Sequence, residues 1–305
     1  MSLFRPAFLA LALLCAHSPQ AQEGTDTQQV RIDVPSLNTA IGGEFLLPAD
    51  PAEDRRRSIR LSRTPVFATP VARVKGTGLM LRNRLHAPVT IDLELDGLSN
   101  AKLAAAMMPR VTLAPLESRE VILVQGVDLM RTGSADFSLK STVGSPDAKP
   151  DQRHVYAWPL AETRRSRISQ GFNGPTHDEE FSQFAIDIAV KEGTPVVAAR
   201  AGVVVFLEDR FFESGLDRTS FRDKANHVRI LHDDGSMATY AHLAPDSVRL
   251  VPGQRVAVGD EIGRSGNTGF SSGPHLHFAI LVNRDMKIVS VPFRMDGVKL
   301  PLAKD

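Results

Sequence analysis

The chain has 305 residues, of which 42% are hydrophobic and 23% are charged, so it is long enough for about two soluble domains with apolar cores. This composition excludes a largely disordered chain, a coiled coil and an integral membrane protein. The formal net charge is +1, which gives no argument for binding to nucleic acid.

Residues 1–21 have the pattern of a secretory signal peptide. Arg5 supplies the positive start, an apolar run occupies Ala7–Ala16, and cleavage is expected after Ala21. The run is about half as long as a membrane-spanning helix requires. The single cysteine, Cys15, lies in the part to be removed. The mature chain would therefore have no thiolate, and any metal must be held by nitrogen and oxygen ligands.

Residues 22–150 are expected to form an N-terminal domain of antiparallel β structure. The segment 89–95 alternates apolar and polar residues, which is the period of a half-buried strand. The segments 119–124 and 137–143 are predicted strands as well, separated by Gly, Asn and Pro. We predict a small β-sandwich of immunoglobulin-like type, followed by a linker at 149–151. No residue pattern in this part indicates a catalytic or binding role.

Residues 151–305 are expected to form a second domain, which is also rich in β structure and has little helical periodicity. Six of the nine histidines lie between His177 and His277, and glycines recur at short intervals. The sequence Asp233-Asp234-Gly235 predicts a tight hairpin turn. The predicted strands in this part are 196–207, 228–232, 237–242 and 275–282.

Within this second domain, a small set of polar side chains interrupts strands that are otherwise apolar. His275 and His277 are two residues apart in a predicted strand, so both imidazoles point to the same face. Asp187 lies in the apolar segment 184–190, where a carboxylate is costly unless it is paired or bound to a cation; a hydrogen-bonded aspartate at a strand end is the alternative. His242 closes the hairpin strand. Three imidazoles and one carboxylate fit a zinc site with an open position for water.

The stretch from Gly171 to Phe278 resembles the LytM/lysostaphin-type peptidoglycan endopeptidases, which are zinc metallopeptidases of the M23 family. Each matching segment is short, but the segments occur in the family's order across somewhat more than 100 residues, and their combination is specific. The matching segments are Ala185–Ile188, Gly193–Ala199, Asn226–Gly235, Tyr240–Leu243, Val256–Gly269 and Ser272–Phe278.

The resemblance implies a role for each residue that matches a functional position of the family. Asp187 and His277 match two zinc ligands. His242 and His275 match the two histidines that flank the catalytic water and assist catalysis. The implied cofactor is one Zn²⁺ per chain, and the implied fold of this part is the β-rich M23 peptidase fold.

One position departs from the family pattern. Much of the family has a ligand histidine four residues before the aspartate, but here that position is Gln183, and glutamine is a poor zinc ligand. Some members place the histidine farther upstream on the entering loop, and His177 is the corresponding residue here. We therefore predict His177 as the third ligand. The alternatives are Glu179 or Glu180, or a site too altered to hold zinc.

The function that the resemblance implies is an exported zinc metalloendopeptidase that hydrolyses peptide cross-links in bacterial peptidoglycan, through a zinc-activated water assisted by two histidines. Its partners would be peptidoglycan stem peptides and, in addition, a protein regulator. The expected location is the periplasm, with secretion as the alternative. Two other functions stay open: a catalytically degenerate LytM-like cell-wall binding protein or amidase activator, and a zinc peptidase that acts on another exported protein.

Three further features of the second domain receive no metal role from the resemblance. His227 and His232 are expected to be hydrogen-bonded strand residues or substrate contacts. The charged segment 211–224 is expected to form a loop beside the substrate groove, or else a plain surface excursion.

Overall fold

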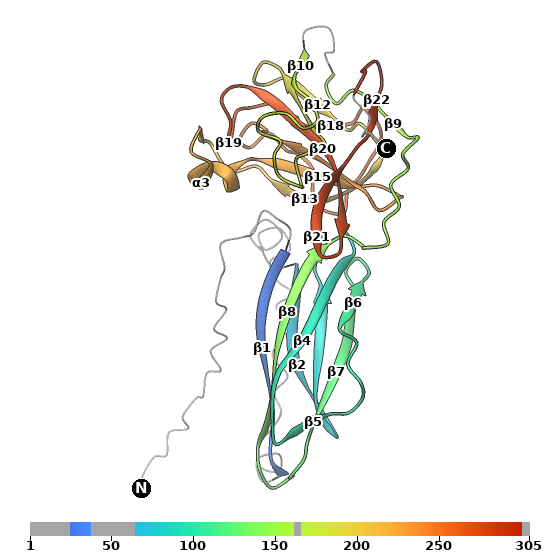
Figure 1. Ribbon diagram of the computed structural model, residues 1–305, viewed down its shortest axis with the longest axis vertical. Helices are drawn as coiled ribbons and strands as arrows, with labels where there is room; N and C mark the ends of the chain where they lie inside the picture. Colours follow the sequence, from blue (N-terminus) through green and yellow to red (C-terminus); the bar gives the residue numbers. More distant parts are fainter. Residues whose placement is uncertain (1–24, 38–64, 162–165, 301–305) are drawn as a thin grey trace, which may run out of the picture.

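The computed structural model describes residues 25–37, 65–161 and 166–300, and Figure 1 shows its two groups of strands stacked along the long axis of the molecule. The predicted signal peptide, residues 1–21, lies outside the described residues. Across the described part of the chain, none of the helices has the length and apolar character needed to cross a membrane. Strands account for most of the ordered elements, as the sequence predicts.

The first group of strands consists of two four-stranded antiparallel sheets packed against each other (Figure 1). One sheet has the order β1-β8-β4-β6 and the other has the order β2-β3-β7-β5. The strands are β1 (Thr25–Val34), β2 (Val66–Arg73), β3 (Gly76–Asn83), β4 (Val89–Ser99), β5 (Ala101–Leu103), β6 (Arg110–Leu113), β7 (Ser118–Gly126) and β8 (Gly133–Val143). This arrangement is a β-sandwich; its immunoglobulin-like type stays a prediction.

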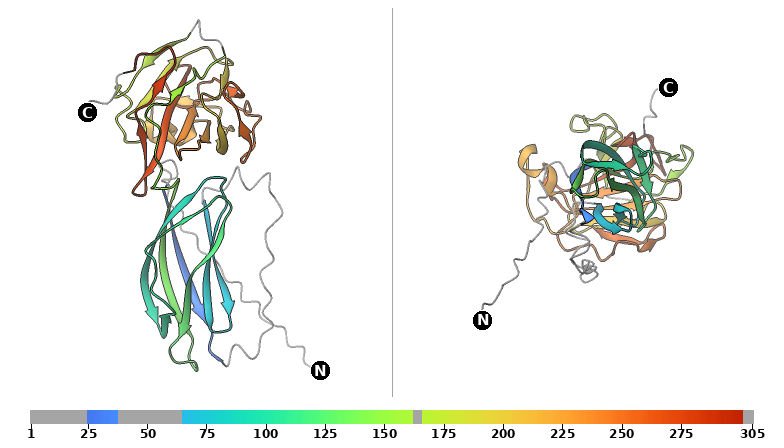
Figure 2. Two further views of the ribbon diagram at one scale, coloured as in Figure 1. Left: turned by 90° about the vertical axis from the view of Figure 1, so that its right-hand side faces the viewer. Right: turned by 90° about the horizontal axis from the view of Figure 1, so that it is seen from below.

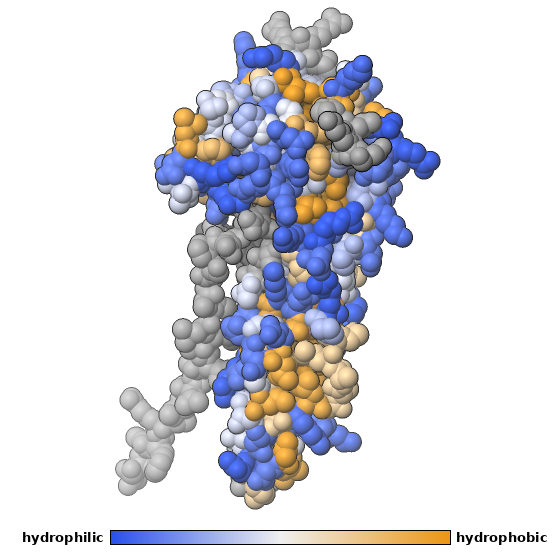
Figure 3. Space-filling model, in the orientation of Figure 1, coloured by the Kyte–Doolittle hydropathy of each residue, from blue (hydrophilic) through white to orange (hydrophobic). Residues whose placement is uncertain are grey.

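Residue alternation explains why these sheets stack. In β4, Val89, Ile91 and Leu93 are buried in the core between the sheets, because alternate side chains of a strand point to one face. Phe137 of β8 is fully buried in the same core. The face shown in Figure 3 is mainly polar, with apolar residues gathered over part of the sandwich and in smaller patches of the second group. The apolar interior of the sandwich contains aliphatic and aromatic side chains and offers no chemistry.

The second group of strands is organised around one large sheet with the order β10-β11-β20-β16-β15-β13-β17, in which β21 also pairs with β20. Its strands are β10 (Arg167–Gln170), β11 (Ala185–Ala189), β13 (Gly202–Glu208), β15 (His227–Leu231), β16 (Met237–Ala241), β17 (Arg255–Val256), β20 (His275–Arg284) and β21 (Lys287–Val291). Short pairs flank it: β9 (Val155–Tyr156) with β22 (Arg294–Met295), β12 (Pro195–Val197) with β18 (Glu261–Arg264), and β14 (Ser214–Gly215) with β19 (Gly269–Phe270). Two short helices, α3 (Arg218–Phe221) and η2 (Arg222–Lys224), follow β14.

The large sheet has one fully apolar face. Ile186 of β11, Phe278 of β20 and Tyr240 of β16 point to this face and pack in one core cluster. The hydroxyl of Tyr240 accepts a hydrogen bond from the backbone N–H of Ala199 at 2.8 Å, so its polar atom is satisfied inside the core. The alternate residues of the same three strands point to the opposite face, which carries the side chains described in the next subsection.

The predicted strand 196–207 is divided in the structure into β12 and β13. β12 pairs with β18, whereas β13 pairs with β15 and β17, so the two halves belong to different sheets. Arg200 lies in the break, and its guanidinium pairs with both carboxylates of the β15–β16 turn, Asp233 and Asp234. The apolar runs on both sides of Arg200 suggested one strand, because both halves are buried. The predicted hairpin turn is confirmed, with Gly235 at a φ of 81°.

The two groups of strands meet at one end of the sandwich, as the left view in Figure 2 and the shared contacts show. Thr142 Oγ1 donates a hydrogen bond to the carbonyl of Met286 at 2.9 Å, and Asn283 Nδ2 donates to the carbonyl of Gly144 at 2.9 Å. In the predicted linker, the N–H of Lys149 bonds to the carbonyl of Asp234 at 3.1 Å. Hydrogen bonds from β8 and from the predicted linker therefore connect the two groups of strands.

Candidate metal centre and its histidines

Strand pairing brings the predicted aspartate and histidines to one place. β20 lies between β11 and β16, and its His277 is directly opposite Asp187 on one side and Ala241 on the other. His275 and His277 project from the same face because they are two residues apart. The antiparallel register of β11 and β20 therefore places the carboxylate of Asp187 beside the imidazole of His277.

The third member of the cluster comes from the loop between β10 and β11. His177 is buried, with 3% of its surface exposed. Its Nδ1 donates a hydrogen bond to the carbonyl of Gly171 at 2.9 Å, and this bond fixes the tautomer that leaves Nε2 unprotonated. His177 Nε2 lies 3.2 Å from Asp187 Oδ1. The loop thus folds back so that a histidine ten residues before the aspartate reaches it.

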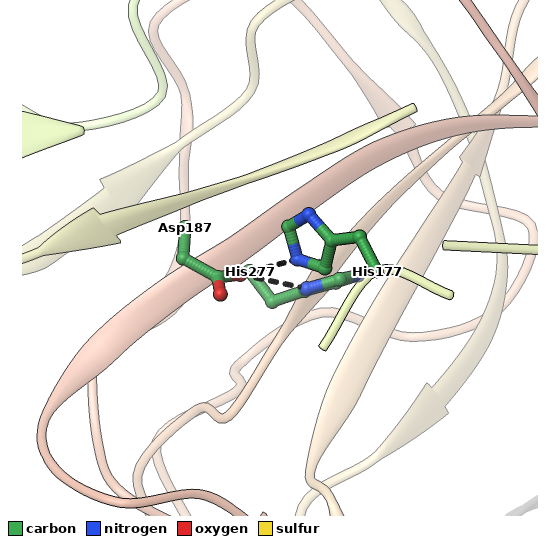
Figure 4. A group of neighbouring side chains, drawn as sticks. All are labelled: His177, Asp187 and His277. Atoms are coloured by element: carbon green, nitrogen blue, oxygen red, sulfur yellow. Dashed lines mark hydrogen bonds and ion pairs between the residues drawn. The ribbon is translucent and has the colours of Figure 1, made fainter. Parts of the chain in front are cut away.

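Asp187 is the centre of the cluster (Figure 4). Its Oδ1 lies 2.9 Å from His277 Nδ1, and its Oδ2 accepts a hydrogen bond from Gln170 Nε2 at 3.0 Å. Burial by itself raises the pKa of Asp187, but the adjacent imidazoles of His177 and His277 outweigh that effect and hold the pKa well below the ordinary value of 3.8. The carboxylate is therefore ionised and suited to face a cation.

The donor set fits a zinc ion. One ligand atom from each of His177, Asp187 and His277 lies within 4.8 Å of the other two. Ligands at ordinary zinc distances in a tetrahedron are about 3.3 Å apart, and the two separations from Asp187 Oδ1, 3.2 and 2.9 Å, are close to that. Two imidazoles and one carboxylate leave a fourth position for water or substrate.

Two more histidines stand beside the cluster. His275 Nδ1 donates to the carbonyl of Gly273 at 2.8 Å, while its Nε2 lies 3.8 Å from Asp187 Oδ1. His242 Nδ1 donates to the carbonyl of Thr268 at 2.6 Å, and its ring centroid is 4.5 Å from that of His275. Both rings are held by backbone carbonyls, so each leaves an unprotonated Nε2 available as a hydrogen-bond acceptor.

Burial keeps these two histidines neutral. It lowers the pKa of His242 to about 3, and the neighbouring His275 and His277 lower it further. Burial is also the main cause that lowers the pKa of His275. His242 has a φ of 62°, in the left-handed region that non-glycine residues rarely adopt. Such a conformation at the end of a strand re-aims the side chain, and strain of this kind is found at functional sites.

A cavity of about 580 Å³ lies over the cluster. Its lining includes all five residues described above, and on one side Leu216, Arg218 and Arg222 from the segment 211–224. The structure therefore places the charged segment beside the cavity. Arg218 pairs with Asp178 at 2.8 Å, and Arg222 pairs with Glu179. These two acids directly follow His177, so the cavity wall is tied to the loop that carries this histidine.

The other candidates lie outside the cluster. Gln183 is exposed and donates to Asn173 Oδ1 at 3.1 Å. Glu179 is paired with Arg222, and Glu180 lies 3.5 Å from the amine of Lys287.

Neither of the two additional histidines reaches the cluster. His227 lines the cavity farther along, donates from Nδ1 to the carbonyl of Ala225 at 2.9 Å and stacks on Phe206. His232 is buried elsewhere and donates to the carbonyl of Ala201 at 2.9 Å.

Several supporting groups were not predicted from the sequence. Gln170 bonds the second oxygen of Asp187, and the carbonyls of Gly171, Thr268 and Gly273 orient three of the four histidines. A backbone carbonyl has no sequence signature, and Gln170 lies 17 residues from Asp187 without a recognisable pattern. Only the path of the chain brings these groups into place.

Comparison with known proteins finds similarity over part of this region. Residues 182–288 match the profile described as Peptidase family M23. The chain is 38% identical over 96 residues to the peptidoglycan DD-endopeptidase ShyA of Vibrio cholerae, covering 32% of this chain and 19% of ShyA. It is 33% identical over 114 residues to lysostaphin of Staphylococcus simulans, covering 37% of this chain and 20% of lysostaphin.

A solved structure covers the same region. The catalytic domain of lysostaphin from Staphylococcus simulans is 26% identical and covers 39% of this chain and 80% of that chain, with a TM-score of 0.27. This chain thus spans about a fifth of the length of the full relatives named above. By the profile match and these sequence relatives, the part of the chain around the cluster is similar to peptidase family M23.

Proposed function

We propose that this chain is an exported zinc metalloendopeptidase that hydrolyses peptide cross-links in bacterial peptidoglycan. The observation that carries the proposal is the complete set of groups at one point: His177, Asp187 and His277 converge, and the free Nε2 atoms of His242 and His275 stand beside them. The names of the relatives support the substrate class, since ShyA is described as a peptidoglycan DD-endopeptidase. We favour the peptide bonds of stem-peptide cross-links over glycine bridges.

In this proposal, His177, Asp187 and His277 hold the zinc ion. A zinc ion so bound supplies a Lewis acid and lowers the pKa of water towards about 7. His242 and His275 accept or orient a proton at Nε2, because their Nδ1 protons are engaged by the carbonyls of Thr268 and Gly273. Burial keeps both imidazoles neutral at pH 7, as a group that accepts a proton must be.

The alternative is a degenerate relative that binds cell wall or activates an amidase without hydrolysis. Such a protein would lack a ligand or a catalytic histidine, and Gln183 is the residue that suggested it. The position of His177 supports the hydrolytic proposal, because its Nε2 lies 3.2 Å from Asp187. A zinc peptidase acting on another exported protein would use the same groups, and only the relatives favour peptidoglycan.

Location and domain division complete the proposal. Residues 1–21 would direct export to the periplasm, with secretion as the alternative destination. Residues 22–150 would be the N-terminal domain and residues 151–305 the peptidase domain. A separate protein regulator is a further proposal, which the cell-wall function favours because unrestrained hydrolysis of the wall is harmful.

The test is the zinc content of the purified mature protein, measured together with hydrolysis of purified peptidoglycan. We expect about one zinc per chain in the wild type. In His177→Ala, zinc and activity should both be lost, since a three-residue donor set would be reduced to two. Gln183→Ala is the matched control on the same loop and should retain both, because the only side-chain hydrogen bond of Gln183 among the described residues is to Asn173.

Two results would contradict the proposal. Full zinc retention in His177→Ala would remove His177 from the ligand set. A wild type that binds no zinc and hydrolyses nothing, also after removal of the N-terminal domain, would instead identify a binding or activating protein.

A further inference from the structure

Arg229 occupies an unusual position on the functional face of the large sheet. It lies in β15 opposite Thr239 of β16, which in turn is opposite Ala279 of β20. His227 lies two residues before it, in the row that contains Ala241 and His277. Arg229 therefore projects from the same face as the metal cluster, one row along the strands and two strands across.

The side chain of Arg229 has no anionic partner within the described ranges 25–37, 65–161 and 166–300. Its Nε is buried without a hydrogen bond. The two other arginines that line the cavity, Arg218 and Arg222, are paired with Asp178 and Glu179. Burial lowers the pKa of Arg229 to about 10, which still leaves the guanidinium charged at pH 7. A half-buried charge without a partner is costly, so Arg229 is a candidate to pair with an anionic ligand.

The cavity connects Arg229 to the metal cluster. Both Arg229 and His277 line it, together with Thr239 and His227 between them. With strands about 4.8 Å apart and about 6.8 Å between rows of side chains, the Cα atoms of Arg229 and His277 are about 12 Å apart. An extended peptide advances about 3.3 Å per residue, so a peptide cleaved at the cluster reaches Arg229 within about three to four residues.

We propose that Arg229 binds a free carboxylate of the substrate peptide and selects peptides that carry one at this distance from the cleaved bond. The inference rests on the proposed function and names the part of the substrate that the groove recognises. A guanidinium suits this task because its planar fork pairs with both oxygens of a carboxylate. Stem peptides of peptidoglycan carry free carboxylates on their acidic and diamino-acid residues, whereas amidated stem peptides have neutral carboxamides in their place.

The experiment compares a soluble cross-linked muropeptide dimer with its amidated counterpart. For the wild type, kcat/KM should fall about 10- to 100-fold on amidation, the range expected for losing a charge-assisted hydrogen bond. In Arg229→Met, kcat/KM should be low and equal for both substrates, and Arg229→Lys should restore part of the difference. Arg255→Met is the matched control, because it removes a positive charge from exposed β17 outside the cavity, and it should discriminate as the wild type does.

Two further measurements distinguish carboxylate recognition by Arg229 from a structural role of Arg229 and from an effect on hydrolysis. Because Arg229 is half-buried and its Nε has no hydrogen bond, Arg229→Met should have the same Tm as the wild type or a higher one; a lower Tm with equal loss on both substrates would overturn the proposal. Calorimetric binding of a free-carboxylate stem tetrapeptide and of its amide needs no turnover. If the wild type hydrolyses nothing yet prefers the free carboxylate through Arg229, the proposed function fails and this inference stands. Equal binding of both peptides would overturn it.

Discussion

The sandwich and the large sheet use the same antiparallel pairing and the same alternation of side chains, yet among the described residues the candidate site lies on the large sheet alone. In the sandwich, the inward faces of both sheets are covered, and residues such as Ile91 and Phe137 fill the space between them. In the large sheet, one face packs into an apolar core, while the other opens into a cavity lined by Asp187, His275 and His277. The difference lies in which face remains accessible, because strand geometry alone is the same in both.

The largest expected effect comes from removing one histidine from the face of the large sheet that lines the cavity. His275→Ala should lower kcat by about 10²- to 10⁴-fold, the usual contribution of a general acid or base, while zinc content stays near the wild-type value. Steady-state hydrolysis of peptidoglycan and metal analysis on the same preparation check this. Activity equal to the wild type would exclude His275 from catalysis, and loss of zinc would make it a ligand instead.

A second change addresses the closed core. Phe137→Ala should reduce the free energy of unfolding by about 3–5 kcal/mol, because it removes a fully buried aromatic ring and leaves a cavity. Urea denaturation followed by far-ultraviolet circular dichroism measures the loss. Below the unfolding transition, kcat per zinc should not change. A large fall in kcat at full folding would show that the sandwich shapes the active site directly.

A third, smaller effect concerns pH. Burial lowers the pKa of His232 to about 4 in the folded protein, against 6.5 for the unperturbed group. Between these values the unfolded chain binds more protons than the folded one, so stability is present above pH 6.5 and falls as the pH decreases towards 4. The contribution of this one group is on the order of 3 kcal/mol.

The measurement for this effect is the slope of Tm against pH between 4 and 7. His232→Asn keeps a donor for the carbonyl of Ala201 but does not titrate, so its slope should be smaller than that of the wild type. His227→Gln is a suitable parallel variant, since burial also lowers the pKa of His227 to about 4. An unchanged slope in His232→Asn would show that this imidazole does not govern acid stability.

Much of the fold and part of the candidate site could be predicted from the sequence, because both depend on local pattern. Alternation in the segment 89–95 predicted a strand that the structure extends to Ser99. The spacing of His275 and His277 predicted that both project from one face, which the register of β20 confirms. Asp187 was recognisable because a carboxylate in an apolar strand is costly without a partner.

The remaining features depend on contacts between distant segments. The corner between β12 and β13 arises where Arg200 meets the turn at Asp233 and Asp234, and no local pattern marks it. The approach of His177 to Asp187 was predicted only through the family resemblance, because it depends on how the loop after β10 folds back. Arg229 occupies a position that alternation alone assigns to an ordinary half-buried side chain, and its lack of a partner becomes visible only when its neighbours are placed.

The ion pairs between the segment 211–224 and the loop of His177 have a consequence for how a polymer enters the cavity. Arg218 and Arg222 lie on one wall, while Asp178 and Glu179 directly follow His177. Partly exposed pairs of this kind contribute little free energy each and weaken with salt. Separating these ion pairs therefore requires little free energy. The same separation would also release contacts of the segment that carries His177. The cavity wall and the segment that carries His177 are in this way joined by contacts whose strength depends on ionic strength.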